Sequence, residues 1–267
     1  MNLSICSLAS GSSGNCYVVG CDSGFVLVDA GISGRQIREG LANIGLSMED
    51  IKAVFVTHDH GDHVKGLPAL LKGSDALIFV NESTLEALSF NVAKERRRLF
   101  STGESISLPG LEVATFQTSH DAKDPAGFSF ITAGKRLAIV TDTGLVTKEI
   151  RDHMSKADML VLESNHDENI LKMGRYPWFL KQRILGDFGH LSNEAAAYAL
   201  ADVLEEDREN GKTREKIVLL AHLSEDNNFP EMAMATITNI LEERGLLGSH
   251  LHIRILGRSE QSPVFYL

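Results

Sequence analysis

The chain has 267 residues, 43% of them hydrophobic and 23% charged, which is an ordinary globular composition with enough apolar residues for a sizeable core. Its formal net charge of -10 at pH 7 argues against a surface that coats nucleic acid through clustered Lys and Arg, although a local phosphate site is not excluded. No apolar run approaches the ~20 residues of a membrane span, and the N-terminus lacks the features of a signal peptide. The three cysteines show no CxxC spacing, so we expect a reduced, cytoplasmic protein with no disulfide framework and no membrane partner.

Short apolar runs alternate with amphipathic segments along the first half of the chain. In chain order the pattern predicts a strand pair at 16–31, a helix at 34–46, a strand at 51–57, a short helix at 63–73, a strand at 76–80, a helix at 83–99 and a second strand pair at 104–120. Alternation of strands and helices is typical of a layered α/β fold.

The predicted helix at 83–99 ends in a basic run, KERRRL. Positive side chains at a helix C-terminus interact favourably with the macrodipole, so a solvated helix end is the simpler interpretation. A contact to an anionic substrate is the alternative.

The same order of elements then begins again. A hairpin at 128–144 ends in Asp142-Thr143-Gly144, where the first hairpin ends in Asp29-Ala30-Gly31. A helix at 145–157 and an apolar strand at 158–167 follow, and that strand ends in Asn165-His166-Asp167, where the first ends in Thr57-His58-Asp59. This order predicts an internal duplication, with two sheets and helices outside them. No low-complexity linker divides the chain, so we expect a single domain over residues 1–267.

The segment VTHDHGDHVKGL, at residues 56–67, places three histidines and two aspartates within six residues. A polar run after an apolar strand is usually a solvated loop. A solvated loop, however, gives no reason to concentrate three of the ten histidines of the chain in one place. Neutral imidazole and carboxylate groups are ligands that suit zinc, iron or manganese, so the segment indicates a metal site.

Other histidine and aspartate residues follow apolar strands, at His120, Asp142 and His222, and so arrive at the same rim of a sheet. Singly, each could be a turn former or a cap. Together with the histidine-rich segment they predict a dinuclear centre in which Asp142 lies between the two metals. One metal takes His58, His60 and His120, and the other takes Asp62, His63 and His222.

The motif THDHGDH, with the later His120, Asp142 and His222, resembles the metallo-β-lactamase superfamily over the whole chain. The stretches SLASGSSGNC, LKMGRYPW, GHLSNEAA and AHLSEDNNFPEMA resemble the YycJ/WalJ/VicX branch of that superfamily. The resemblance implies a four-layer αββα sandwich with internal duplication, and all seven ligand positions are occupied here. It also implies a metal-dependent hydrolase of nuclease type that acts on DNA as a 5'-to-3' exonuclease, and a functional link to a two-component regulatory system.

Two metals about 3.5–4 Å apart can lower the pKa of a bridging water, so we expect a metal-bound hydroxide to attack the substrate. Asp62 is expected to ligate a metal and also to accept the proton of the nucleophile. Two divalent ions are expected, either zinc or manganese, with iron as a third alternative.

Candidate substrate contacts precede the amphipathic helical pattern that begins at residue 194. His190, Ser192 and Asn193 lie where backbone N–H groups at a helix start would favour a phosphate, and we expect His190 to act in catalysis there. Helix capping alone is the alternative for Ser192. His166 either approaches the site or stabilises the second half. The loop at residues 10–15 is either a tight turn or an anion cradle.

One further cluster, RYPW at residues 175–178, could contact a nucleic-acid strand by charge and stacking, or pack under a loop.

Three functions therefore compete. The first is a phosphodiesterase, in particular a DNA exonuclease, and the second is a thioester or lactone hydrolase that uses the same metals. The third is a regulatory binding protein with a vestigial metal site, against which the intact ligand set argues. The sequence leaves the oligomeric state open.

Overall fold

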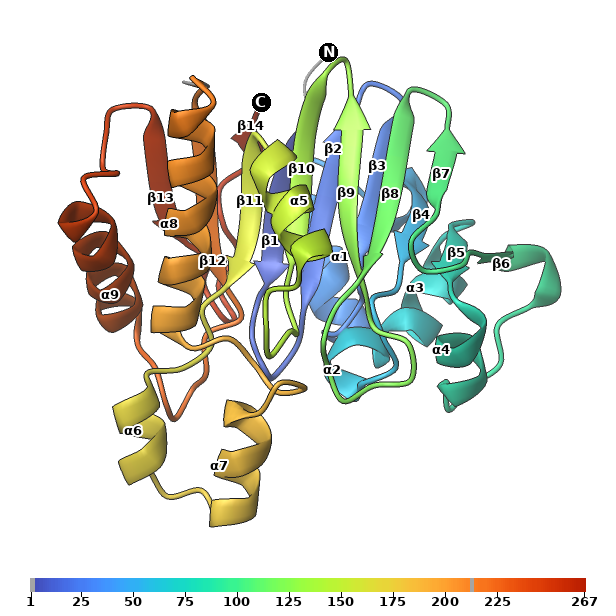
Figure 1. The fold of residues 1–267 in the computed structure, drawn as a ribbon. Helices are drawn as coiled ribbons and strands as arrows, with labels where there is room; N and C mark the ends of the chain where they lie inside the picture. The colour runs from blue at the N-terminus through green and yellow to red at the C-terminus, as the bar shows by residue number, and fades with distance from the viewer. Residues whose placement is uncertain (1–2, 212–213) are drawn as a thin grey trace. The chain divides into compact units, whose positions relative to one another are not determined.

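The computed structural model describes residues 3–211 and 214–267 and contains two seven-stranded mixed sheets (Figure 1). The first sheet contains β1 (Ser4–Ala9), β2 (Cys16–Cys21), β3 (Gly24–Val28), β4 (Ile51–Phe55), β5 (Leu77–Val80), β6 (Arg97–Leu99) and β14 (Phe265–Tyr266). The second contains β7 (Ser105–Leu108), β8 (Leu111–Gln117), β9 (Ala126–Thr132), β10 (Lys135–Val140), β11 (Met159–Glu163), β12 (Lys216–Ala221) and β13 (Leu251–Ile255).

Helices connect most of the parallel strands. They are α1 (Gly34–Asn43), α2 (Gly61–Val64), α3 (Leu67–Gly73), α4 (Glu82–Ala87), α5 (Lys148–Lys156), α6 (Glu168–Met173), α7 (Trp178–Leu185), α8 (Asn193–Glu209), α9 (Pro230–Glu243) and the 3₁₀ helices η1 (Met48–Asp50) and η2 (Lys94–Arg96).

The strand orders of the two sheets show the internal duplication. The first sheet has the order β14-β1-β2-β3-β4-β5-β6, and the second, listed from the matching edge, has the order β7-β8-β9-β10-β11-β12-β13. Pairing is antiparallel for β14/β1, β1/β2 and β2/β3, and correspondingly for β7/β8 and β8/β9. It is parallel for β3/β4, β4/β5 and β5/β6, and for β10/β11, β11/β12 and β12/β13. Two copies of one strand-helix pattern therefore make two sheets of the same design.

Two compact units share the described residues. Unit 1 comprises the described residues of Met1–Gln117, Ala122–Lys135 and Leu256–Leu267, and unit 2 comprises the described residues of Thr118–Asp121 and Arg136–Ile255. Unit 1 has an apolar core between its strands and α1 and α3, with Leu27, Val54 and Leu67 fully buried. In unit 2, α8 packs against α5 and α9, and every residue of β11 is buried. The expectation of one domain over residues 1–267 stays a prediction.

The predicted helix at residues 83–99 is wrong in its second half. The helix α4 ends at Ala87, and residues 97–99 form strand β6, which pairs in parallel with β5. The guanidinium groups of the basic run bind backbone carbonyls, with Arg96 donating to Ala76 and Ser74 and Arg97 donating to Val92. These arginines therefore anchor a sheet edge, and sheet pairing has overridden the helical periodicity of the segment.

Among the residues that the structure describes, no helix combines the length and the apolarity needed to cross a bilayer.

Candidate metal centre

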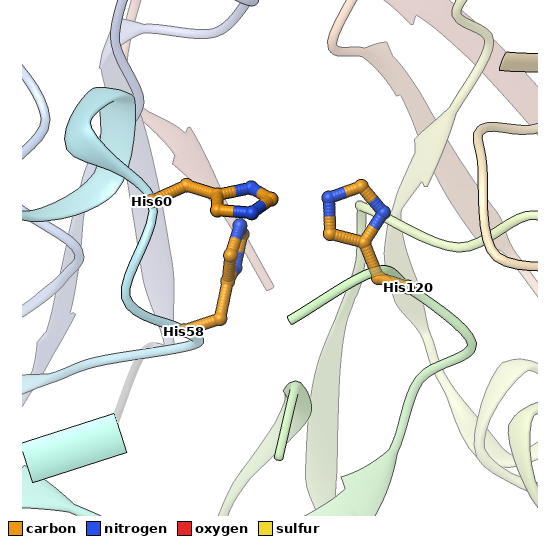
Figure 2. A group of neighbouring side chains, drawn as sticks. All are labelled: His58, His60 and His120. Atoms are coloured by element: carbon orange, nitrogen blue, oxygen red, sulfur yellow. The ribbon is translucent and has the colours of Figure 1, made fainter. Parts of the chain in front are cut away.

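The histidine-rich segment follows β4, the apolar strand between β3 and β5. The strand ends at Phe55, and the chain then turns so that His60 is the N-cap of α2 while Asp62 and His63 lie within that helix. The imidazole rings of His58 and His60 meet edge to face with 4.6 Å between their centroids (Figure 2). The ring of His63 lies 4.1 Å from that of His58, so unit 1 collects three imidazoles in one place.

A buried aspartate orients these imidazoles. Asp29 Oδ2 lies 2.7 Å from His63 Nδ1 and accepts the hydroxyl hydrogen of Thr57 at 2.9 Å. A carboxylate only accepts, so Nδ1 of His63 carries the ring proton and Nε2 is the unprotonated nitrogen, the form in which a histidine can ligate a metal. Because the Thr57 hydroxyl donates to Asp29, Nδ1 of His58, at 3.0 Å from Thr57 Oγ1, must donate to that oxygen. Asp29 therefore sets the tautomer of both histidines.

Burial raises the pKa of Asp29, while the charge and hydrogen bond of His63 and the bonds from Thr57 act in the opposite direction. The backbone N–H of Thr57 also donates to Asp29 Oδ1 at 2.9 Å. The carboxylate thus has partners on both oxygens, as a buried carboxylate needs.

The Gly/Ser-rich loop at residues 10–15 contacts the same segment. The amide nitrogen Nδ2 of Asn15 lies 3.0 Å from His63 Nε2 and 3.5 Å from Asp62 Oδ2, and the Asn15 backbone N–H donates to Asp62 O at 2.8 Å. Gly31 makes this approach possible, because a Cβ there would lie only 1.6 Å from Asp62 O. The loop therefore lines the donor set of unit 1. The sequence had left open whether this loop contacts the site.

Unit 2 gathers a second set of donors. One donor atom each from Asp142, Glu163, His190 and His222 lies within 4.8 Å of every other in that set. Glu163 Oε1 accepts from Nδ1 of His190 at 2.7 Å and from Nδ1 of His222 at 2.8 Å. Its Oε2 accepts the backbone N–H of Thr143 at 2.9 Å. Burial acts to raise the pKa of Glu163, but the charges and hydrogen bonds of His190 and His222 together outweigh it and hold that pKa well below its usual range.

His120 lies beside this set, with its ring centroid 4.9 Å from that of His190. Its Nδ1 donates to Gly189 O at 3.0 Å, which leaves Nε2 facing Asp142 Oδ1 at 3.8 Å and Asp121 Oδ1 at 3.4 Å. Burial lowers the pKa of His120, which favours the neutral form of the ring. Neutral imidazole with a carbonyl on its far nitrogen is the arrangement that metal-binding histidines adopt.

Two residues of the donor sets, Asp142 and His222, and the orienting residue Asp29 have left-handed backbones. The φ angle is 59° at Asp29, 55° at Asp142 and 57° at His222, and none of these residues is glycine. Such conformations are costly for residues with a Cβ and are found where the surrounding structure enforces them, especially at functional sites. In each case the residue lies one or two positions after the end of a strand.

The remaining predicted residues have different surroundings. Ser192 is the N-cap of α8 and accepts from the Ala195 backbone N–H at 3.1 Å, which is the capping alternative. Asn193 is fully buried, where its amide bonds to Ser164 and Asn228. Burial lowers the pKa of His166 to about 4, and neither ring nitrogen has a hydrogen-bond partner among the described residues. The substrate roles of these residues stay predictions.

Three residues of the site were not assigned to it from the sequence, namely Asn15, Asp29 in its orienting role, and Glu163. Glu163 is the last residue of the apolar strand β11. A carboxylate at the end of a buried strand is the sequence signal by which Glu163 could have been assigned to the site. For Asn15 there was no signal beyond its place at the end of a Gly/Ser-rich loop.

The donors in both units fit divalent metal ions. Unit 1 holds the predicted ligands His58, His60, Asp62 and His63, and unit 2 holds His120, Asp142 and His222. Imidazole nitrogens whose tautomer is fixed by a carboxylate or carbonyl, next to further carboxylates, are a donor set for zinc, manganese or iron. The fold and these donors define a metal-binding α/β protein.

Comparison with known proteins identifies the family. The β-lactamase superfamily domain matches residues 25–208. The chain is 41% identical over 248 residues to Exodeoxyribonuclease YycJ of Bacillus anthracis, covering 92% of this chain and 91% of the relative. It is 37% identical over 244 residues to Exodeoxyribonuclease WalJ of Streptococcus pneumoniae, covering 90% and 88%. This chain therefore belongs to the β-lactamase superfamily, in the branch that contains YycJ and WalJ.

The structural comparison agrees. The metallo-β-lactamase fold protein YhfI from Bacillus subtilis superposes with a TM-score of 0.73 at 14% sequence identity, covering 100% of both chains. The αββα fold class and the family resemblance predicted from the sequence are both confirmed.

Proposed function

We propose that this protein is a metal-dependent DNA exonuclease of the β-lactamase superfamily that uses a dinuclear metal centre. The observation that carries the proposal is the pair of buried donor sets in which Asp29 and Glu163 orient the ligand histidines. The relatives named exodeoxyribonucleases, at 41% and 37% identity over most of the chain, support DNA as the substrate class. Residues 1–267 would form one catalytic domain.

The residues that would hold the ions are His58, His60 and His120 for one ion and Asp62, His63 and His222 for the other, with Asp142 as a ligand available to both. Zinc and manganese are the leading candidates, with iron as a third, and all three accept this mixture of imidazole and carboxylate. Divalent ions so placed supply an activated water nucleophile and stabilise charge on a phosphoryl oxygen.

The protein side chains move protons and position the substrate. The Asp62 side chain is about one-quarter exposed, so it can accept the proton of the attacking water and pass it to solvent. Nδ1 of His190 is engaged by Glu163, which leaves Nε2 to donate to a phosphate oxygen. The pKa of Glu163 lies well below its usual range, so Glu163 stays ionised and its carboxylate accepts a hydrogen bond from Nδ1 of His190, which orients the ring. His166 adds a neutral N–H donor from its buried position.

The test measures cleavage of 5'-labelled and 3'-labelled duplex DNA with Zn²⁺ and with Mn²⁺, together with metal content. We expect stepwise cleavage from 5' ends by the wild-type protein and about two metals per chain. His190→Ala should cut turnover by about tenfold or more, because one charge-assisted hydrogen bond contributes roughly 1.5–3 kcal/mol, and it should leave metal content unchanged. His60→Ala should lower both, while the exposed His252→Ala should change neither.

A wild-type protein that cleaves no phosphodiester with either metal would overturn the proposal. Hydrolysis of a thioester or lactone panel in that case would favour the second candidate function, which uses the same metals. A metal content well below two ions per chain, with no hydrolysis of any substrate, would favour a regulatory binding protein with a vestigial metal site.

The three free cysteines support a reducing, cytoplasmic compartment, because free thiols persist there. The link to a two-component system and the oligomeric state stay predictions to be tested.

A further inference from the structure

The segment of residues 168–188, which we call the α6–α7 arm, contains helices α6 and α7 and carries exposed apolar side chains. In Figure 1 the two helices lie beyond the carboxyl ends of β11 and β12. Met173 is 88% exposed, Trp178 62%, Phe179 72% and Phe188 66%. These are four of the nine large hydrophobic side chains that are exposed among the described residues, and the single tryptophan of the chain is one of them. Aromatic side chains so exposed indicate a binding surface.

The α6–α7 arm is held in a defined conformation. The ammonium group of Lys181 is largely buried and donates to the carbonyls of Lys172 and Gly174, each at 2.7 Å, which ties the turn between the helices to α7. Asp167 caps the first turn of α6, and the hydroxyl of Tyr176 donates to Asp226 at 2.8 Å. A stable frame therefore presents the exposed side chains, and little ordering entropy would be lost on binding.

The charge of this region differs from that of the rest of the chain. The α6–α7 arm, residues 168–188, includes four Lys or Arg residues, one of them the largely buried Lys181, and two acidic residues, Glu168 and Asp187, in a chain of net charge -10. Arg175 is exposed, in the turn between Met173 and Trp178. Lys172 pairs with the exposed Glu168, and Arg183 pairs with Asp121. Surface pairs of this kind contribute little free energy, so a phosphate could replace either acidic partner.

Both ends of the α6–α7 arm lead directly into the donor set of unit 2. His166 and Asp167 precede α6, and Gly189 and His190 follow Phe188. The carbonyl of Gly189 accepts from His120, and the carbonyl of Asp187 accepts from the hydroxyl of Ser119. A polymer whose phosphate lies at His190 would therefore continue toward the α6–α7 arm.

We infer that the α6–α7 arm is a binding site for unpaired DNA, in which Trp178 and Phe179 stack on bases and Arg175 contacts a phosphate. Exposed aromatic rings with interspersed cations are the combination that binds single strands with little sequence preference. Basic residues concentrated on one segment of an acidic protein favour a polyanion over an acidic or neutral protein partner. The inference rests on the proposed function, since it supplies that function with a single-stranded substrate end.

The experiment measures the affinity of the metal-loaded protein for a fluorescein-labelled, phosphorothioate-linked single-stranded oligonucleotide by anisotropy, so that binding is read without cleavage. Trp178→Ala combined with Phe179→Ala should weaken binding by about tenfold or more, because stacking of one base on an aromatic side chain contributes about 1–3 kcal/mol of binding free energy. Trp178→Phe should retain most of the affinity. Tyr266→Ala is the matched control, because Tyr266 is exposed to the same extent as Trp178 but lies on β14. It should bind like the wild type.

A second measurement separates the α6–α7 arm from the metal centre. Hydrolysis of bis-p-nitrophenyl phosphate, which has no bases, should be unchanged in the double variant. Unchanged DNA affinity in the double variant, or an equal loss in Tyr266→Ala, would overturn the inference. If the double variant bound DNA normally but lost self-association or vesicle binding, the exposed side chains would serve a second copy of the chain or a lipid surface, and the inference would be overturned. If the wild type binds DNA through the α6–α7 arm but cleaves no phosphodiester, the proposed function is wrong, while the inference that the α6–α7 arm binds DNA is supported.

Discussion

His63 Nδ1 and Asp29 Oδ2 lie 2.7 Å apart, and both side chains are almost completely buried. Thr57 lies between the same carboxylate and His58, with bonds of 2.9 Å and 3.0 Å. One carboxylate at the end of β3 therefore sets the orientation of two ligands that follow β4. The equivalent role in unit 2 belongs to Glu163, which binds Nδ1 of both His190 and His222.

Asp29→Asn should weaken metal binding. The asparagine side chain has one acceptor oxygen in place of two, so it cannot accept from both the Thr57 backbone N–H and His63. We expect a loss of about 10- to 100-fold in metal affinity, the usual effect of removing a partner that orients a ligand. Competition with a chelator measures this affinity, and Asp22→Asn, in the exposed turn between β2 and β3, is the control. Equal affinity in the two variants would show that Asp29 does not orient the ligands.

Glu163→Gln should lower both metal affinity and phosphodiester turnover. The amide oxygen cannot replace both carboxylate oxygens, which together serve two histidines and the backbone N–H of Thr143. The variant should lose about tenfold or more in turnover, and part of its metal should exchange faster. Glu209→Gln, at the exposed end of α8, controls for the change of charge. Activity at the wild-type level with full metal content would rule out this role.

Gly31→Ala should destabilise unit 1. The added Cβ would lie 1.6 Å from Asp62 O and 2.7 Å from Asn15 N, and both are backbone atoms that cannot move without disturbing the site. Overpacking of this kind costs about 1–3 kcal/mol or more in the free energy of unfolding. Urea denaturation measures this change. Gly61→Ala is the matched control, because a Cβ there would meet nothing within 4 Å, and its unfolding should be unchanged or slightly more difficult.

The stability of the protein should rise with pH above about 8 through Lys216. Burial lowers the pKa of the Lys216 ammonium from 10.5 to about 8, and Arg214 adds to this effect. Below pH 8 both the folded and the unfolded state hold the proton. Between pH 8 and 10.5 only the unfolded state keeps it, so the free energy of unfolding increases with pH in that window, by about 1 kcal/mol per pH unit.

Lys216→Met removes this titration, although it also removes the bonds from Lys216 to the carbonyls of Met154 and Ala157 at the end of α5. The readout is therefore the slope of the unfolding free energy against pH rather than its value. The slope of the wild type should exceed that of Lys216→Met between pH 8 and 10. The exposed Lys52→Met should keep the wild-type slope. Parallel slopes for all three proteins would contradict the prediction.

Much of the fold could be predicted from the order of local patterns. Runs such as KAVFV and LAIVT read as buried strands because a parallel strand covered on both faces is apolar throughout. The repeated order of hairpin, helix and strand predicted the duplication that the strand order of the two sheets now shows. The failure at residues 88–99 has the opposite cause. Its helical periodicity was a local signal, and pairing of β6 with β5 depends on a strand about 20 residues earlier in the chain.

The sequence by itself determined the donor types and their places at strand ends, because metal chemistry restricts the residues and strand patterns are local. Only the tertiary structure decided which groups orient them. Asp29 meets Thr57 across 28 residues, and Glu163 meets His222 across 59. Such contacts depend on the register of neighbouring strands and on the left-handed turns at Asp29, Asp142 and His222. Register is a property of the assembled sheet, since a shift by one residue would turn each side chain to the opposite face.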